Sequence, residues 1–187
     1  MELDRAIRER RSIRRFTDQA VTEQEIRELM EAARWAPSWK NGQVWEFIVV
    51  RDKKMIEQIT ATYREGNPAR SCSLTASALI VACARTGVSG TVGGVERTKF
   101  TNWFMFDLGL AVQNFCLKVH DLGLGTVVVG SLSHDRCREI LNLPEGYEVV
   151  VALPLGRPAE AAKEGPARRS AAEICHREIF GNRCAGF

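Results

Sequence analysis

The stretch NWFMFDLGLAVQNFCLKVHDLGLGTVVVG, residues 102–130, decides the fold class of this 187-residue chain. Its first part predicts a long helix over about 102–121 that is buried on several sides, because apolar residues lie around most of its circumference. These residues are Phe104, Leu108, Ala111, Val112, Phe115, Leu117 and Val119. Gly123 predicts the end of that helix, and the apolar run over 125–130 predicts a strand. The stretch therefore predicts a central helix that leads into a buried strand.

The sequence on either side of this stretch predicts further strands separated by shorter helices. A helix-like face begins at Leu3, and a capping box at Thr22–Glu25 opens a helix that Pro37 ends. Residues 86–99, rich in glycine and without a clear period, are expected to form a mobile surface loop. Strands are expected over about 45–50, 77–84 and 147–155, and helices over about 53–64, 133–143 and 170–179. This order predicts an α+β sheet covered by helices, in one domain over residues 1–187.

Composition and charge restrict the class of protein. Hydrophobic residues make up 45% of the chain and charged residues 26%, which is typical of a folded soluble protein. The formal net charge is only +3, so no field of the whole molecule attracts polyanions such as nucleic acids. The apolar runs are shorter than the roughly 20 residues of a membrane helix, so no membrane span is expected. Acidic residues interrupt the basic N-terminus, which argues against an export signal, and we expect a cytoplasmic protein.

Side chains that usually carry catalysis are scattered along the sequence. The six cysteines form no C-x-x-C pair and are expected to be mostly reduced thiols, and no metal motif is present. No serine lies in a G-x-S-x-G elbow, and no phosphate-binding loop of the nucleotide type occurs. Gly123 and Gly125 follow a helix and open a strand, which is the reverse of a dinucleotide-binding fingerprint. The chain is therefore not expected to supply its own nucleophile or to bind a metal.

The remaining signal is RRSIRRF, residues 10–16, in which four arginines surround one serine; we refer to it as the arginine cluster. Three interpretations stay open: a solvated helix end, a nucleic-acid-binding face, or a pocket for one small phosphate. A nucleic-acid-binding face needs basic residues that continue along a surface, but the neighbouring predicted helices at 22–34 and 53–65 are mixed or acidic. A single dianion fits better, because Ser12 and the arginine forks can surround it with charge-assisted hydrogen bonds.

Five stretches, in order along the chain, resemble the FMN-dependent nitroreductase family. They are RRSIRRF at 10–16, APSWKNGQVWEFIVV at 36–50, DLGLA at 107–111, GLGT at 123–126 with Val129 and Gly130, and LPLGRP at 153–158. The resemblance implies an α+β fold with a central, mainly antiparallel sheet between helices. It also implies an intertwined homodimer with two FMN sites at the subunit interface. The anion at the arginine cluster would then be the phosphate of FMN.

The resemblance further implies which residues contact FMN. Arg10 and Ser12 correspond to phosphate and ribityl contacts, with Arg11 in the same group, and Arg14 to a basic residue at the pyrimidine edge of the isoalloxazine ring. A polar loop is expected to hydrogen-bond the flavin, from the other subunit or along the interface, through Pro37, Ser38, Trp39, Asn41 and Gln43. Further contacts are expected from the backbone of Val129, Gly130 and Ser131, and from Arg168 or Arg169 at the phosphate.

This sequence departs from the family pattern in the polar loop. The family's Q-P-W is Gln43-Val44-Trp45 here. The change removes a rigid turn residue and keeps both flanking side chains, so we expect the loop to be retained.

The activity that the resemblance implies is hydride transfer from NAD(P)H through flavin N5 to an electron-poor acceptor, a nitroaromatic or a quinone, by a ping-pong mechanism. A flavin carries the chemistry itself, which agrees with the lack of a catalytic side-chain set. The residues expected to contact the acceptor are Trp39, Lys40, Phe100, Trp103 and Phe104, although the aromatic ones also suit ordinary core packing. Enone reduction, reductive dehalogenation and flavin fragmentation stay open as alternative reactions. A flavin-free module that binds nucleic acid is a more remote alternative, and the choice between NADH and NADPH is undetermined.

Overall fold

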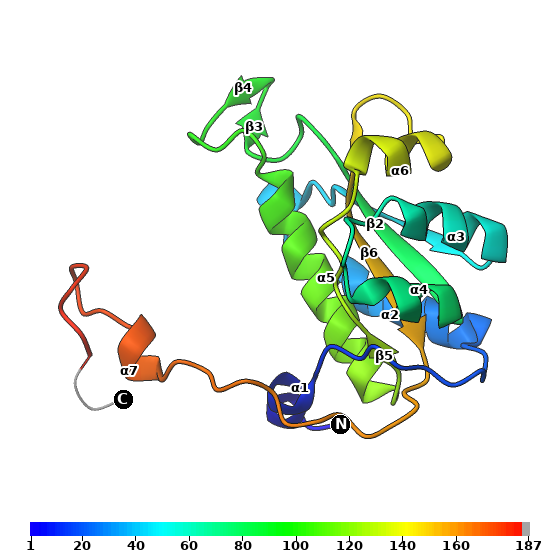
Figure 1. Ribbon diagram of the computed structural model, residues 1–187. Coiled ribbons are helices and arrows are strands. Elements are labelled where there is room, and N and C mark those ends of the chain that lie inside the picture. The colour runs from blue at the N-terminus through cyan, green and yellow to red at the C-terminus, as the bar shows by residue number, and fades with distance from the viewer. Residues whose placement is uncertain (185–187) are drawn as a thin grey trace.

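A four-stranded sheet between two layers of helices forms the body of the protein (Figure 1). The computed structural model describes residues 1–184. The strands lie in the order β1 (Trp45–Val50), β2 (Ala78–Arg85), β6 (Tyr147–Gly156) and β5 (Gly125–Thr126), and neighbours in the sheet are antiparallel. The predicted α+β class with a mainly antiparallel sheet is confirmed.

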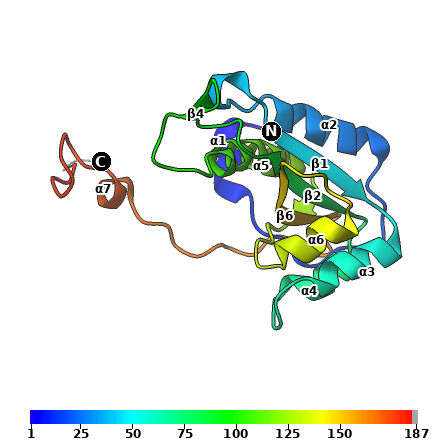
Figure 2. The ribbon, with the colours of Figure 1, turned by 90° about the horizontal axis from the view of Figure 1, so that it is seen from above.

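The two helical layers cover opposite faces of this sheet (Figure 2). Side chains of β2 alternate between the layers, as the pleat of a strand requires: Ile80 and Ala82 point to one core, and Leu79 and Val81 to the other. The first layer consists of α2 (Glu23–Arg34) and α5 (Phe104–Asp121), and the second of α3 (Lys53–Ala61), α4 (Ala69–Thr75) and α6 (His134–Ile140). The predicted long central helix is therefore α5, and it packs between α2 and the sheet.

The arginine cluster lies on an extended segment beside the edge strand β5. It follows α1 (Leu3–Glu9), and the backbone N–H of Ile13 donates to the carbonyl of Thr126 at 2.9 Å. Four residues later the N–H of Thr17 donates to the carbonyl of Arg157, also at 2.9 Å. The main chain of residues 10–17 is thus held between β5 and the residues that follow β6. This fixes the backbone positions from which the arginine side chains extend.

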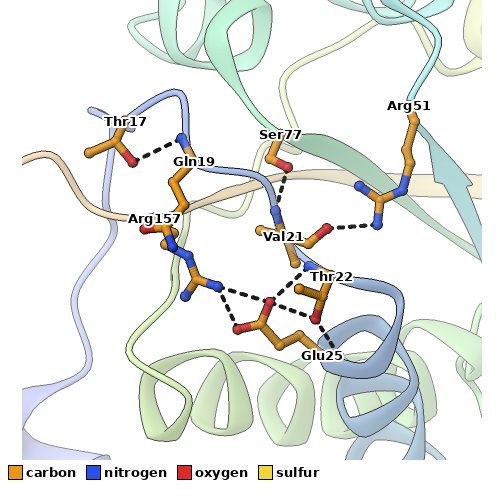
Figure 3. Close-up of polar contacts among 8 residues, drawn as sticks. All are labelled: Thr17, Gln19, Val21, Thr22, Glu25, Arg51, Ser77 and Arg157. Carbon is orange, nitrogen blue, oxygen red and sulfur yellow. Dashed lines mark hydrogen bonds and ion pairs between the residues drawn. The ribbon is translucent and has the colours of Figure 1, made fainter.

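A group of polar contacts attaches the next residues to the start of α2 (Figure 3). The carboxylate of Glu25 accepts the backbone N–H of Thr22 at 2.8 Å and a guanidinium N–H of Arg157 at 2.9 Å. The hydroxyl of Thr22 in turn accepts the N–H of Glu25 at 3.2 Å, so the predicted capping box is confirmed. Just before it, the N–H of Val21 donates to the hydroxyl of Ser77 at 2.8 Å. These contacts join the helix start to the ends of two strands.

Helix α4 is not among the elements that the sequence predicts. Its seven residues, ARSCSLT, are poor in strong helix formers, so local propensity gives little signal. Tertiary packing supplies the stability instead, because Ala69 and Cys72 are buried in the second core. The helix expected near 170–179 is the single turn α7 (Ala171–Ile174).

The expected loop over 86–99 contains a small hairpin of β3 (Thr91–Val92) and β4 (Val95–Glu96). Its turn residues Gly93 and Gly94 have φ of +59° and +76°, both in the left-handed region, as a type I′ turn requires. The expected surface loop therefore contains a short hairpin, because two of its glycines are turn residues. The strand expected over 125–130 pairs regularly only at β5, with one further bridge between Val129 and Ala152.

The chain after β6 runs past α1 and then projects from the body, with α7 near its end (Figures 1 and 2). The exposed apolar side chains of this tail are Ile174, Ile179 and Phe180. None of the helices formed by residues 1–184 combines the length and apolar character of a membrane crossing.

Replacement of Glu25 by glutamine should isolate the ion pair with Arg157, because glutamine preserves the capping-box hydrogen bonds. We expect the free energy of unfolding near neutral pH to fall by about 1–2 kcal/mol. Burial opposes ionisation of Glu25, but hydrogen bonds from Thr22 and Arg157 outweigh it and hold the pKa below its ordinary value of 4.5. The stabilisation is therefore complete above about pH 4.5 and is lost as the pH falls through the lowered folded-state pKa.

Urea denaturation of both proteins between about pH 7 and about pH 3 measures this difference. The gap between wild type and Glu25→Gln should close at the acid end, and a gap that stays constant would contradict the assignment. Glu31→Gln is the matched control, because Glu31 pairs with Arg34 at 2.6 Å on the exposed side of the same helix. It should change the stability less than Glu25→Gln does at neutral pH, because an exposed ion pair contributes little.

Candidate functional site

The arginine cluster lines a cavity of about 640 Å³, and residues 160–168 form the opposite wall. Cavities of this size are typical of small-molecule sites. The acidic side chains on its walls are Glu160 and Glu164. The basic side chains are Arg10, Arg11, Arg14, Arg15, Lys163 and Arg168. The excess of basic groups makes this a site for an anion, and arginine forks bind phosphate or carboxylate with two hydrogen bonds each.

The guanidinium groups in this cavity differ in their partners. Arg11 donates to the carbonyls of Arg8 and Arg10, at 2.5 and 2.9 Å, so it closes the end of α1. Its Nε is buried and has no partner among residues 1–184. The side chains of Arg10, Arg14 and Arg168 line the cavity without a hydrogen bond or ion pair to any described residue. These three groups are therefore available to a bound anion.

The structure distinguishes between Arg168 and Arg169, either of which the sequence allows as the basic residue at the phosphate. Arg168 lines the cavity together with Ser12. Arg169 instead donates to the carbonyl of Glu173 in α7 and does not line the cavity. The geometry therefore favours Arg168 as the basic residue that faces the arginine cluster.

Helix α4 contributes two further residues, Pro68 and Ser71, that the sequence analysis did not single out. The signal for them is the dipeptide Asn67-Pro68, since proline is common at the start of a helix and Asn-Pro marks a turn. The side-chain amide of Asn67 donates to the carbonyl of Ser131 at 3.2 Å, and the backbone N–H of Arg64 donates to the same oxygen at 3.1 Å. The turn before α4 thus connects the cavity wall to residues 129–131.

Within that segment, Val129 is buried while Gly130 and Ser131 are exposed. The N–H of Val129 donates to the carbonyl of Ala152 at 2.9 Å, so the segment lies along β6. A Cβ at Gly130 would meet only a methyl of Val151 at 3.7 Å, which is ordinary contact. The fold itself does not require glycine at this position.

The polar loop, residues 37–43, has an unusual backbone. Lys40, Asn41 and Gln43 have φ of 47°, 55° and 44°, in the left-handed region that residues other than glycine rarely adopt. The hydroxyl of Ser38 accepts the N–H of Gln43 at 3.0 Å and closes the loop, while the short helix η1 (Trp39–Asn41) forms its middle. The side chains of Pro37, Lys40, Asn41 and Gln43 are exposed. Strained backbone that presents exposed polar groups is typical of binding loops.

Aromatic side chains gather next to the polar loop. The rings of Trp39 and Trp103 meet edge to face with centroids 5.5 Å apart, and Phe100 and Phe106 flank Trp103 at 6.2 and 5.6 Å. Residues 99–103, Met105 and Phe106 line an open hollow of about 550 Å³. Phe104 does not take part, because it is 8% exposed and packs in the first core. Phe106, which the sequence analysis did not single out, is exposed in its place.

Helix α5 keeps the arginine cluster and the polar loop apart. Val119 and His120, at its carboxyl end, line a second cavity of about 260 Å³ together with Arg10. At its amino end, Asp107 accepts the N–H of Trp39 at 3.0 Å. A helix of 18 residues is about 27 Å long. A single chain therefore does not bring both groups to one small ligand.

The buried thiols of the body are poor nucleophiles. Burial raises the pKa of Cys83 to about 12 and the pKa of Cys116 and Cys137 to about 11. These groups are protonated at neutral pH, and a protonated thiol does not attack an electrophile efficiently. The chemistry of this chain therefore depends on what its cavities bind.

Proteins of known sequence and structure resemble this chain over most of its length. The model of the nitroreductase family matches residues 7–157. A protein of Methanothermobacter thermautotrophicus named "Putative NADH dehydrogenase/NAD(P)H nitroreductase" is 33% identical over 164 residues, covering 86% of this chain and 79% of that protein. The "FMN reductase (NAD(P)H)" of Bacillus subtilis is 27% identical over 193 aligned residues, covering 97% of this chain and 76% of that protein. The solved structure of NADPH:FMN oxidoreductase from Vibrio harveyi, complexed with NAD⁺, has a TM-score of 0.80 at 27% identity, covering 95% of this chain and 77% of that chain.

Replacement of Gly125 by alanine should push against Ile13 and so displace the backbone of the arginine cluster. The added Cβ would lie 2.8 Å from the Cβ of Ile13, whose backbone is fixed to Thr126. Overpacking of this kind costs about 1–3 kcal/mol of stability. Gly109→Ala is the control, because a Cβ there meets no atom within 4 Å on the exposed side of α5. It should stabilise the protein by about 0.5–1 kcal/mol. Urea denaturation measures both, and equal effects would contradict the close approach at Gly125.

Proposed function

The chain belongs to the nitroreductase family, and from that premise we propose that it is an NAD(P)H-dependent flavin oxidoreductase with FMN as its cofactor. The matched residues 7–157 include the arginine cluster, the polar loop and the sheet. Two of the similar proteins are named for FMN, and one for NAD(P)H nitroreduction. The observation that carries the proposal is the positive cavity at the arginine cluster, whose unpaired guanidinium groups fit a phosphate dianion.

Arg10, Arg168 and the hydroxyl of Ser12 would hold the phosphate of FMN, while the Nε of Arg11 is buried against the opposite wall. That wall is main chain at this point, because a Cβ at Gly165 would lie 2.6 Å from the same Nε. A cavity with walls on two sides suits one small anion. An extended nucleic-acid backbone would require a continuous basic face instead.

Arg14 has a different role in this proposal. It lies near α4. Burial raises the pKa of the Cys72 thiol in that helix, and the nearby charge of Arg14 acts weakly in the opposite direction. When bound, FMN would accept hydride from NAD(P)H and pass it to an electron-poor acceptor. Arg14 would stabilise the negative charge that develops at the pyrimidine edge of the ring. An opposite charge within about 4–6 Å lowers the pKa of an acid by about 1–3 units.

We propose a homodimer as the active form. The polar loop is at the far end of α5 from the arginine cavity, so a second copy would have to bring its own loop to complete each site. The surface offers apolar contacts for such an interface, and exposed apolar patches mark association sites. On the body the exposed apolar side chains include Trp35, Phe100, Met105 and Phe106, and on the projecting tail Ile179 and Phe180.

The aromatic cluster around Trp103 would bind the acceptor. Planar nitroaromatics and quinones can stack on Trp39, Phe100 or Trp103, and Lys40 lies beside them on the exposed side of the polar loop. The alternative reactions of this fold, enone reduction, reductive dehalogenation and flavin fragmentation, differ in the acceptor and use the same cavity. An acceptor panel therefore distinguishes among them.

The purified protein should be yellow and should bind FMN with the stoichiometry of one flavin per chain. Initial rates measured against both NAD(P)H and a nitroaromatic or quinone should give parallel double-reciprocal lines, because NAD(P)⁺, the product of the first half-reaction, would leave before the acceptor binds. Visible absorbance, FMN titration and steady-state kinetics check these outcomes. A colourless protein that takes up no FMN would overturn the proposed function.

Arg14→Ala should retain part of the FMN but slow the reduction of bound flavin by NAD(P)H by about tenfold or more, because about 1.4 kcal/mol of stabilisation corresponds to a factor of ten. Anaerobic stopped-flow absorbance measures the rate directly. Arg8→Ala, in α1 and outside the cavity wall, is the control and should keep the wild-type rate. Reduction at the wild-type rate in Arg14→Ala would refute the role given to Arg14.

A further inference from the structure

We infer that Asp107 is a positioning residue that ties the polar loop to residues 86–99 through one carboxylate oxygen. Its Oδ2 accepts the backbone N–H of Trp39 at 3.0 Å and the hydroxyl hydrogen of Ser89. Asp107 is 1% exposed and Ser89 4%, so both contacts are shielded from water. The inference deepens the proposed function, because the polar loop is expected to contact the flavin ring and residues 86–99 pack against Trp39 and Trp103, which are expected to contact the acceptor.

The burial of Asp107 requires an explanation. A carboxylate removed from water is unfavourable unless hydrogen bonds replace its hydration. Asp107 lies in the first turn of α5, where the helix dipole favours a negative charge. Its hydrogen bonds, however, go to two segments that are 68 and 18 residues away in sequence, and not to its own helix. The residue therefore joins separate parts of the chain and does not cap the helix.

Other contacts join the same two segments. The indole N–H of Trp39 donates to the carbonyl of Thr91 at 3.1 Å, directly before the hairpin turn. The ring of Trp39 meets Trp103 edge to face. Gly90 packs so closely on Trp103 that an added Cβ would lie 2.9 Å from its Cβ. The polar loop, the hairpin and the aromatic cluster thus form one packed unit with the carboxylate of Asp107 at its buried centre.

The polar loop needs such an anchor because its backbone is strained. Positive φ values at three non-glycine residues within four positions, Lys40, Asn41 and Gln43, persist only where surrounding contacts determine them. The contact to Asp107 fixes the start of the loop at Trp39, and the hydroxyl of Ser38 fixes its end at Gln43. Loss of the carboxylate would release the start of the loop and, at the same time, residues 86–99.

Two variants separate these effects. Asp107→Leu removes both hydrogen bonds and keeps the branched shape of the side chain with larger terminal groups, and Ser89→Ala removes only the contact to residues 86–99. In the holoenzyme, Asp107→Leu should raise both the Kd for FMN and the KM for the acceptor by about tenfold, the scale of one hydrogen bond to a charged group. Ser89→Ala should raise the KM for the acceptor alone. Asp107→Asn keeps a carbonyl acceptor and should recover most of both losses.

Hydrogen exchange provides a readout that does not depend on flavin chemistry. Amides of residues 38–43 and 86–99 should exchange at least about tenfold faster in Asp107→Leu, and only those of 86–99 in Ser89→Ala. Asp121→Asn is the matched control, because Asp121 binds Lys118 at 2.8 Å at the other end of α5. It should leave exchange in both segments and both constants unchanged.

Each outcome of these experiments either supports or overturns the role inferred for Asp107. A lower melting temperature in Asp107→Leu with wild-type exchange in both segments would overturn it, because the residue would then act on stability alone. If Asp107→Leu does not fold, Ser89→Ala decides, and unchanged exchange over 86–99 overturns the inference. If the protein binds no FMN, the proposed function fails while the exchange measurements still test the coupling through Asp107.

Discussion

The contact on which the rest of this structure depends is the interlock between residues 10–17 and the edge of the sheet. Gly125 and Gly156 have no side chains where Ile13 and Phe16 pack, and added Cβ atoms would lie 2.8 and 2.7 Å from those residues. Backbone hydrogen bonds from Ile13 and Thr17 hold the same segment. The arginines are thus placed by main-chain bonding and apolar packing, and not by their own charges. This is why several like charges can be crowded at one cavity.

Much of this could be predicted from the sequence because the signals are local. The period of apolar residues in α5, the capping box at Thr22 and the strands of the sheet all follow from residues close in the chain. The hairpin at 91–96 could have been found from its Gly93-Gly94 turn. Helix α4 could not be predicted, because its residues have a low helix propensity and their burial against the sheet depends on tertiary packing.

The sequence predicts some residues of the candidate site better than others. The sequence identified the arginine cluster, but the choice between Arg168 and Arg169 depends on the path of the tail after β6. It identified the aromatic residues near 100–106, but which of them is exposed depends on the rotation of α5, and Phe104 faces the core. In the sequence Asp107 is only one residue of the DLGLA stretch, because nothing local shows that its partners are Trp39 and Ser89.

The direction of α5 relates the polar loop to the arginine cavity. The amino end of a helix favours anions and the carboxyl end favours cations, each by about 0.3–1 kcal/mol. In α5 the amino end holds Asp107 under the polar loop, and the carboxyl end lies against Arg10 and Arg11. A two-fold axis perpendicular to α5 would set two copies of the helix antiparallel, so each polar loop would approach the arginine cavity of the other chain. Such an isologous pair forms two identical sites and closes on itself. The helix that separates the half-sites within one chain would therefore be the element that aligns them between two.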